Sequence, residues 1–200
     1  MKENKKEKDK QIRKFLQLVT LSYLINLSLA QISIEGGCPS FDCCKDEFNP
    51  LPVEKMTGIW YLYGGISHFF DADTKCTKVN VMALSTDYFY VNTTQVVISS
   101  GHDRAYDGFG NFTIKGKVIT LVSDLKIPIP YDIIKITPDY LIMLTCLDCG
   151  FFTHQGAGLY LYIYTKSEFP AQTLVNEINE KVEQCGVSLN WVQKQDHDGC

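Results

Sequence analysis

The chain of 200 residues lacks the short motifs that mark the common catalytic sites. It has no Gly-x-Ser-x-Gly nucleophile turn, no His-Glu-x-x-His zinc helix, no phosphate-binding loop and no dinucleotide fingerprint. Its acidic pairs, Asp71 with Asp73 and Asp103 with Asp107, lack the glycine and the closing glutamate of a calcium loop. We therefore expect no metal and no cofactor, and we expect that the protein is not an enzyme.

Histidine is also scarce, and the four histidines do not cluster in the sequence. They are scattered over predicted loops and the C-terminal tail, where we expect surface positions or the mouth of a pocket. These residues are His68, His102, His154 and His197.

Positive charge is scarce beyond residue 30. Of the 19 Lys and Arg and the 23 Asp and Glu, seven and three fall within residues 1–30, which leaves 12 against 20 from Gln31 onward. Proteins that bind nucleic acid carry an excess of Lys and Arg on one face. The composition therefore excludes nucleic acid as a partner.

No apolar run reaches the roughly 20 residues that a membrane-spanning helix needs. The longest, Phe15–Ala30, is interrupted by polar residues, follows the basic segment Lys2–Lys14 and ends in Ser28-Leu29-Ala30. This order predicts a secretory signal peptide over residues 1–30, cleaved between Ala30 and Gln31. The alternative is an uncleaved anchor or an amphipathic helix.

Cysteine is plentiful beyond the predicted cleavage point. An even number of cysteines in a secreted chain predicts disulfides, here up to four. A Cys-x-x-Cys pair also occurs in redox and zinc sites, but no second pair completes such a site here. Two N-glycosylation acceptors, Asn92 and Asn111, fit the same compartment and would have to face outward if used. The eight cysteines are Cys38, Cys43, Cys44, Cys76, Cys146, Cys149, Cys185 and Cys200.

Between Lys55 and Ser167, short runs of β-branched and aromatic residues alternate with turn residues such as Ser99–Gly101 and Asp107–Gly110. About eight short strands at this spacing predict an all-β fold, either an up-and-down barrel or a sandwich. The expected strands span residues 59–63, 78–84, 88–91, 111–114, 118–122, 133–134, 141–145 and 159–164.

One helix is predicted after Pro170. Its apolar residues Leu174, Val175, Ile178 and Val182 recur at the spacing of a surface helix with one buried face, and Gly186 suits its C-terminal end. The chain shows no internal repeat and no linker of low complexity, so we expect one domain over residues 31–200.

The last predicted strand bears on what the interior holds. An eight-stranded barrel is just wide enough to be packed with side chains or to hold one small ligand. In residues 159–164, Tyr160, Tyr162 and Tyr164 share one face. Because a tyrosine hydroxyl needs a partner, three of them on an inner face favour a roomy, partly polar cavity. The alternative is that they face solvent or a partner.

Three segments, in matching order and separation, resemble motifs of the lipocalin family. Residues 55–61, Lys-Met-Thr-Gly-Ile-Trp-Tyr, are similar to the first motif, and residues 137–140 resemble the Thr-Asp-Tyr turn between two strands. Lys166 stands where the family usually has a lone Arg before its C-terminal helix. The resemblance covers residues 38–200 and is closest to the apolipoprotein D and bilin-binding branch, in which a Cys-Pro also precedes the first strand.

This resemblance implies an eight-stranded antiparallel up-and-down β-barrel with one C-terminal α-helix packed outside. Trp60 would plug the closed end under the Lys166 cation, Gly58 would let the backbone approach, and Asp139 and Tyr140 would form the turn. Two features depart from the family pattern. Pro138 is inserted in the turn, and lysine in place of arginine loses the planar guanidinium.

The resemblance also implies two disulfides, Cys38–Cys146 and Cys76–Cys200. We expect Cys149 to pair with Cys43 or Cys44, and Cys185 to take the other.

The function implied is that of a secreted carrier which binds a small hydrophobic ligand, such as a fatty acid, a sterol, a retinoid-like molecule or a pigment, in the barrel. If Asn92 and Asn111 face outward, their strand neighbours face inward, and the resemblance places the remaining lining residues. The predicted ligand-binding residues are Val79, Val81, Phe89, Val91, Phe112, Ile114, Ile133, Met143, Tyr160 and Tyr162.

The alternative is a secreted interaction protein with a closed barrel that binds a protein partner through its loops. Its basis is two aromatic doublets, Phe69-Phe70 and Phe151-Phe152, which also suit a transient contact with a membrane. No pattern in the sequence specifies an oligomeric state.

Overall fold

The computed structural model describes residues 32–34, 44, 53–66, 73–113, 117–122, 128–148 and 157–200. The predicted signal peptide, both aromatic doublets, Cys38, Cys43, Cys149 and Ile114 lie outside these residues.

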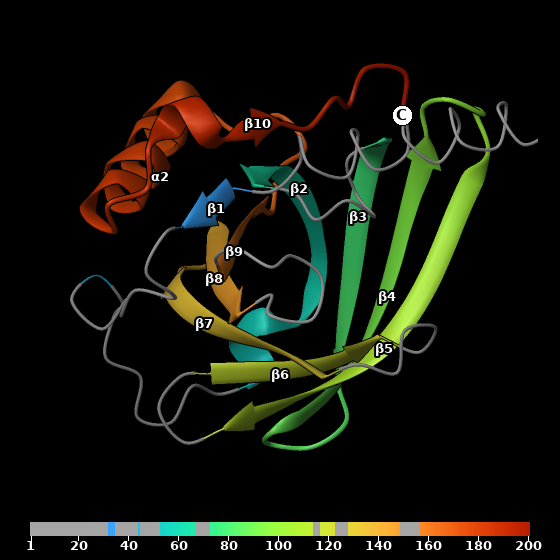
Figure 1. Ribbon diagram of the computed structural model, residues 1–200. Helices are drawn as coiled ribbons and strands as arrows, with labels where there is room; N and C mark the ends of the chain where they lie inside the picture. Colours follow the sequence, from blue (N-terminus) through green and yellow to red (C-terminus); the bar gives the residue numbers. More distant parts are fainter. Residues whose placement is uncertain are drawn as a thin grey trace, which may run out of the picture.

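Eight antiparallel strands form a closed barrel (Figure 1). Each strand from β2 to β9 pairs with the next one along the chain, and β9 also pairs with β2. The up-and-down barrel is therefore confirmed, and the sandwich is excluded. The strands are β2 (Gly58–Ile66), β3 (Thr74–Ala83), β4 (Tyr88–Val97), β5 (Asp103–Thr113), β6 (Lys117–Val122), β7 (Pro128–Ile136), β8 (Tyr140–Asp148) and β9 (Ala157–Thr165).

Two short strands that the sequence did not predict extend the sheet. β1 (Ile32–Ile34) pairs with the beginning of β9, and β10 (Gln193–Lys194) pairs with Gly64 and Gly65 of β2. A Cβ atom on Gly64 would lie 2.6 Å from the Gln193 carbonyl oxygen, so only glycine lets the two strands approach this closely.

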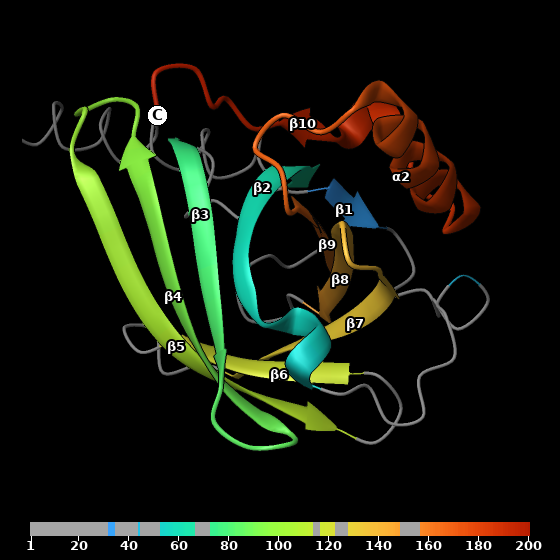
Figure 2. The ribbon, with the colours of Figure 1, turned by 180° about the vertical axis from the view of Figure 1, so that it is seen from behind.

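The helix α2 (Gln172–Gln184) packs on the outside of the barrel (Figures 1 and 2). Its buried residues are Val175, Ile178 and Val182, and the last two join a cluster that contains outward-facing residues of β8 and β9. The predicted helix and its apolar face are confirmed, and Gly186 follows the helix with a φ of 73°. The described residues also include two 3-10 segments. They are η1 (Val53–Met56), at the lower end of the barrel in Figure 2, and η2 (Leu189–Trp191).

The prediction of a turn at Asp107–Gly110 was wrong, because these residues lie in the middle of β5. Gly108 and Gly110 pair with Val91 and Phe89 of β4. A Cβ atom on Gly110 would lie 2.1 Å from the Phe89 ring. The glycines therefore make room for an aromatic side chain inside the barrel, and glycine in a strand has this use as well as a use in turns.

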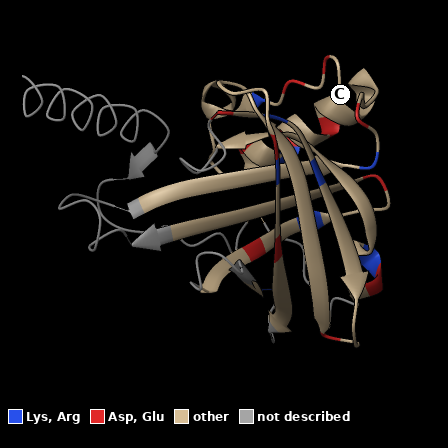
Figure 3. Cartoon of the chain, turned by 90° about the vertical axis from the view of Figure 1, so that its right-hand side faces the viewer, with Lys and Arg blue, Asp and Glu red and all other residues tan. Residues whose placement is uncertain are grey.

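In the view of Figure 3, the positions of Lys and Arg and those of Asp and Glu are interspersed along the described ribbon. Among the described residues, no helix is both long enough and apolar enough to cross a bilayer.

Candidate functional site

One end of the barrel is sealed by Trp60 at the start of β2. Its side chain is 1% exposed, and its indole N–H donates to the Met56 carbonyl of η1 at 2.6 Å. The Lys166 Nζ lies 3.7 Å from the centre of the indole ring and donates to the Thr57 carbonyl at 2.9 Å. The predicted plug is therefore present at this end, with lysine in the role expected of the cation.

Gly58 has to be a glycine for two reasons. Its φ is 96°, which side-chain-bearing residues rarely adopt, and a Cβ atom there would lie 3.2 Å from the Lys166 Nζ. Burial lowers the pKa of Lys166 below its ordinary value. The ring contact and the hydrogen bond to Thr57 act in the opposite sense, because they favour the ammonium form.

The inserted Pro138 does not prevent the predicted turn between β7 and β8. The Thr137 hydroxyl accepts from the Asp139 N–H at 3.2 Å and from the Tyr140 N–H at 3.0 Å. The Asp139 carbonyl accepts from the Lys166 N–H, which ties the turn to the residue after β9. The Tyr140 hydroxyl donates to Glu177 of α2 at 2.8 Å.

Inside the barrel, the inward faces of the strands form one apolar cluster with Trp60. Val79, Val81, Phe89 and Ile133 belong to its buried part, and Val91, Phe112 and Met143 pack against it. The structure thus brings together residues that the sequence analysis placed on five different strands. Buried residues of the cluster that the sequence analysis did not select are Val53, Met56, Val118, Ile136 and Leu141.

The tyrosines of β9 face inward. Tyr164 packs against the apolar cluster, Tyr162 stacks on Tyr164 with ring centres 6.2 Å apart, and Tyr131 of β7 contacts Tyr162 edge-on at 5.9 Å. Tyr160 shares their strand parity and is buried. The alternative placement against solvent does not hold.

Polar residues in the interior escaped the sequence analysis. Gln95 follows Phe89 and Val91 on the same face of β4, and Thr145 follows Leu141 and Met143 on the same face of β8. Both are buried. Strand alternation from Phe89 would have identified Gln95, had β4 been expected to continue beyond Val91.

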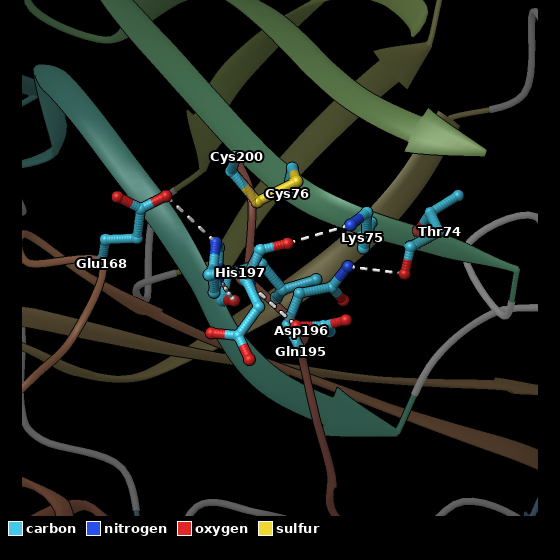
Figure 4. The surroundings of a disulfide bond; sticks show 10 residues. Thr74, Lys75, Cys76, Glu168, Gln195, Asp196, His197 and Cys200 are labelled. Carbon is cyan, nitrogen blue, oxygen red and sulfur yellow. Dashed lines mark hydrogen bonds and ion pairs between the residues drawn. A yellow bond between two sulfur atoms is a disulfide. The ribbon is translucent and has the colours of Figure 1, made fainter. Parts of the chain in front are cut away.

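The C-terminal tail completes the wall at the other end of β2. Strands β2 and β3 pair only over Gly58–Tyr61, and beyond that point the tail lies between them. The Gln195 N–H donates to the Tyr63 carbonyl of β2, and the Cys76 N–H of β3 donates to the Asp196 carbonyl, both at 2.9 Å. The disulfide Cys76–Cys200 holds the tail in this seam (Figure 4).

The disulfides agree with the predictions as far as the described residues reach. Cys76–Cys200 is confirmed, and Cys185 pairs with Cys44, one of its two expected partners. Cys146 is also disulfide-bonded, and its predicted partner Cys38 lies outside the described residues.

The surface or pocket-mouth position expected for His197 was wrong, because this residue of the tail is buried, with its ring against β2. Its Nε2 lies 2.8 Å from the Leu62 carbonyl oxygen, and its Nδ1 lies 3.5 Å from the Glu168 carboxylate (Figure 4). Glu168, His197 and Cys200 come close enough together to suggest a metal site. The Cys200 sulfur is bonded to Cys76, however, so it is no thiolate ligand.

No family model and no curated protein sequence matches the chain. Solved structures do match it. Lobster apocrustacyanin A1 has a TM-score of 0.66 at 16% identity, covering 82% of this chain and 89% of that one. Insecticyanin from the tobacco hornworm Manduca sexta has a TM-score of 0.69 at 13% identity, covering 84% and 90%. The cockroach allergen Per a 4 has a TM-score of 0.62 at 15% identity, covering 80% and 94%. These likenesses show that the chain has the lipocalin fold.

Proposed function

We propose that this protein is a secreted carrier that holds one small, mostly apolar molecule inside its barrel, and that it is not an enzyme. The observation that carries the proposal is the apolar cluster on the inward faces of the strands, sealed at one end by Trp60. Removing apolar ligand surface from water contributes about 25 cal/mol per Å². A closed barrel of eight strands has an interior of the size that suits one small ligand.

The predicted lining supports the same proposal. Nine of the ten predicted ligand-binding residues are described, and each lies on an inward strand face. A siderocalin of similar fold, with a TM-score of 0.56 at 10% identity, is described as functioning through dual ligand specificities. Secretion is supported by the disulfides, since these persist in oxidising compartments.

The test uses two methionine-to-tryptophan substitutions in the full chain. Met143→Trp adds bulk on the inward face of β8, whereas Met82→Trp adds the same bulk to an exposed residue of β3. We expect wild type and Met82→Trp to bind an apolar fluorescent probe equally, and Met143→Trp to bind it at least tenfold more weakly. Circular dichroism checks that both variants are folded.

Extraction of the purified protein and mass spectrometry identify any ligand acquired from the expression host. A folded wild-type protein that takes up no probe and yields no extractable ligand contradicts the proposal.

A further inference from the structure

Three buried polar side chains on the inward faces of the strands have no hydrogen-bond partner. They are Thr77 through its hydroxyl, Gln95 through both atoms of its amide, and Thr145 through its hydroxyl. Gln95 is 2% exposed and Thr145 is 3% exposed. Because buried polar groups in proteins are almost always hydrogen-bonded, each of these atoms needs a partner that the described residues do not supply.

The strand register shows that these side chains face the interior. Gln95 lies six positions after Phe89 on a strand that pairs with β5 without interruption, so both side chains point the same way. Thr145 pairs directly with Tyr160 on β9 and shares the parity of Leu141. Thr77 shares the parity of Val79. The unpaired groups therefore come from the neighbouring strands β3 and β4 and from β8, which pairs with neither of them.

Gln95 and Thr145 lie away from the sealed end, whereas Thr77 is two residues from Val79, the cross-strand partner of Trp60. On β4, Gln95 is seven residues beyond the start of the strand, and Phe89, which packs in the Trp60 cluster, is next to that start. On β8, Thr145 is likewise five residues beyond Tyr140, which belongs to the turn that contacts Lys166. A ligand in the barrel would therefore have its apolar part on the cluster and its other end near Gln95 and Thr145.

The buried polar groups are neutral. Among the described residues, the buried side chains that face the interior include no lysine, arginine, aspartate or glutamate. Arg104 pairs with Gln95 and so shares its face of the sheet, but it is exposed to water rather than buried, and its guanidinium lies 5.7 Å from the centre of the Tyr106 ring. Burying a carboxylate without a buried cation is unfavourable, whereas a neutral group loses much less hydration.

On the basis of the proposed carrier function, we infer that the ligand is an uncharged amphiphile whose polar end both donates and accepts hydrogen bonds, such as a long-chain alcohol or primary amide, bound by Gln95 and Thr145. The Gln95 amide offers one donating nitrogen and one accepting oxygen, and each threonine hydroxyl can do either. One alcohol or amide group can therefore satisfy partners of both kinds, while an anion can satisfy only the donors.

The test compares ligands that share one alkyl chain and differ only at the end: dodecanol, dodecanamide, dodecyl methyl ether and dodecanoate, each displacing the same apolar probe at pH 8. The wild-type protein should bind dodecanol and dodecanamide at least tenfold more tightly than the ether and dodecanoate. Gln95→Leu should lose this preference while it still binds the ether. Because leucine leaves no unpaired amide, this variant should fold with a thermal midpoint no lower than that of wild type.

Gln184→Leu makes the same substitution at an exposed position at the end of α2 and should behave as wild type. Thr145→Val provides a second variant and should weaken the preference for the alcohol. Tighter binding of dodecanoate, or a preference that survives Gln95→Leu, overturns the inference. If the probe itself does not bind to the wild-type protein, the result contradicts the proposed carrier function rather than this inference about the polar end of the ligand.

Discussion

Trp60 and Lys166 form a contact that joins the beginning of the barrel to its end, 3.7 Å apart between the ring centre and Nζ. An ammonium group is attracted to the face of an indole ring, which favours the charged form of lysine. Burial of the same group favours the neutral amine. Burial lowers the pKa of Lys166 below its ordinary value.

We predict the pH dependence that follows from Lys166. Because the folded protein releases this proton more readily than the unfolded chain does, the unfolded chain binds more protons below the ordinary pKa of 10.5. The free energy of unfolding of wild type, relative to that of Lys166→Met, should therefore rise as the pH is raised from 7 towards 10.5. Urea denaturation of both proteins over this range measures the difference, and other titrating groups cancel in the comparison.

A fall of that difference with pH would mean that attraction to Trp60 and Thr57 dominates, and would contradict the prediction. Lys166→Arg serves as the control, because arginine keeps its charge throughout this range. The difference in free energy of unfolding between Lys166→Arg and Lys166→Met should therefore not change with pH.

At the scale of elements, the C-terminal tail has the most unusual position. Residues 193–198 lie between β2 and β3, where the two strands have stopped pairing, and they donate to or accept from both. Two side-chain hydrogen bonds also join the tail to β3 (Figure 4). The Lys75 Nζ donates to the Asp198 carbonyl, and the Gln195 side-chain amide donates to the Thr74 carbonyl.

The disulfide Cys76–Cys200 should hold this tail in place. Its two cysteines are 124 positions apart, and a cross-link over about 100 residues contributes roughly 4–5 kcal/mol in the chain-entropy model. The double variant Cys76→Ala/Cys200→Ala should lose about 2–5 kcal/mol of stability, and the Gln195 and Cys76-position amides should exchange faster with deuterium. Urea denaturation and hydrogen exchange measure the two effects.

The matched control is Cys44→Ala/Cys185→Ala, which removes a disulfide of similar span, 141 positions, next to α2. It should lower the stability by a similar amount and leave the Gln195 amide protected in the native state. Equal exchange of that amide in both double variants would show that the tail does not depend on its own disulfide.

These elements also show how far the sequence predicts the structure. The barrel and α2 are predicted because hydrophobic residues recur with the period of a strand or a helix, and the contact of Trp60 with Lys166 follows from a motif. The tail was not predicted as part of the barrel wall, because β10 has only two residues and these show no alternation of apolar and polar side chains. Gln95 was missed for a related reason, since the predicted strand ended at Val91 and its register was not continued.

At the scale of the whole molecule, the outer wall of the barrel carries an exposed apolar patch across β3 to β6. Tyr88 and Phe109 stack with ring centres 5.9 Å apart and are 39% and 38% exposed. The patch consists of Met82, Tyr88, Tyr90, Phe109 and Ile119. Asn111 lies within it, because its cross-strand partners are Tyr88 on one side and Ile119 on the other.

We predict that Asn111 is the glycosylation acceptor whose glycan matters for solubility. It is exposed, while Asn92 is only partly so. In a eukaryotic secretory host, Asn111→Gln should raise self-association at a given concentration, because large exposed apolar patches promote contact between molecules. Asn92→Gln should have a smaller effect. Peptide mapping locates the glycans, and analytical ultracentrifugation measures association.

A glycan found at Asn92 alone, or equal association of the two variants, would contradict this prediction. Combining Asn111→Gln with Phe109→Ser should restore the monomer if the exposed apolar surface is the cause.

The position of the tail has a consequence for how the protein is made. Strands β2 and β3 emerge early from the ribosome, but they pair only at Gly58–Tyr61. The backbone partners of Tyr63 and Cys76 are supplied by Gln195 and Asp196, and the disulfide of Cys76 by Cys200, which is made 124 positions later. This part of the wall can therefore form only after all eight barrel strands have been synthesised.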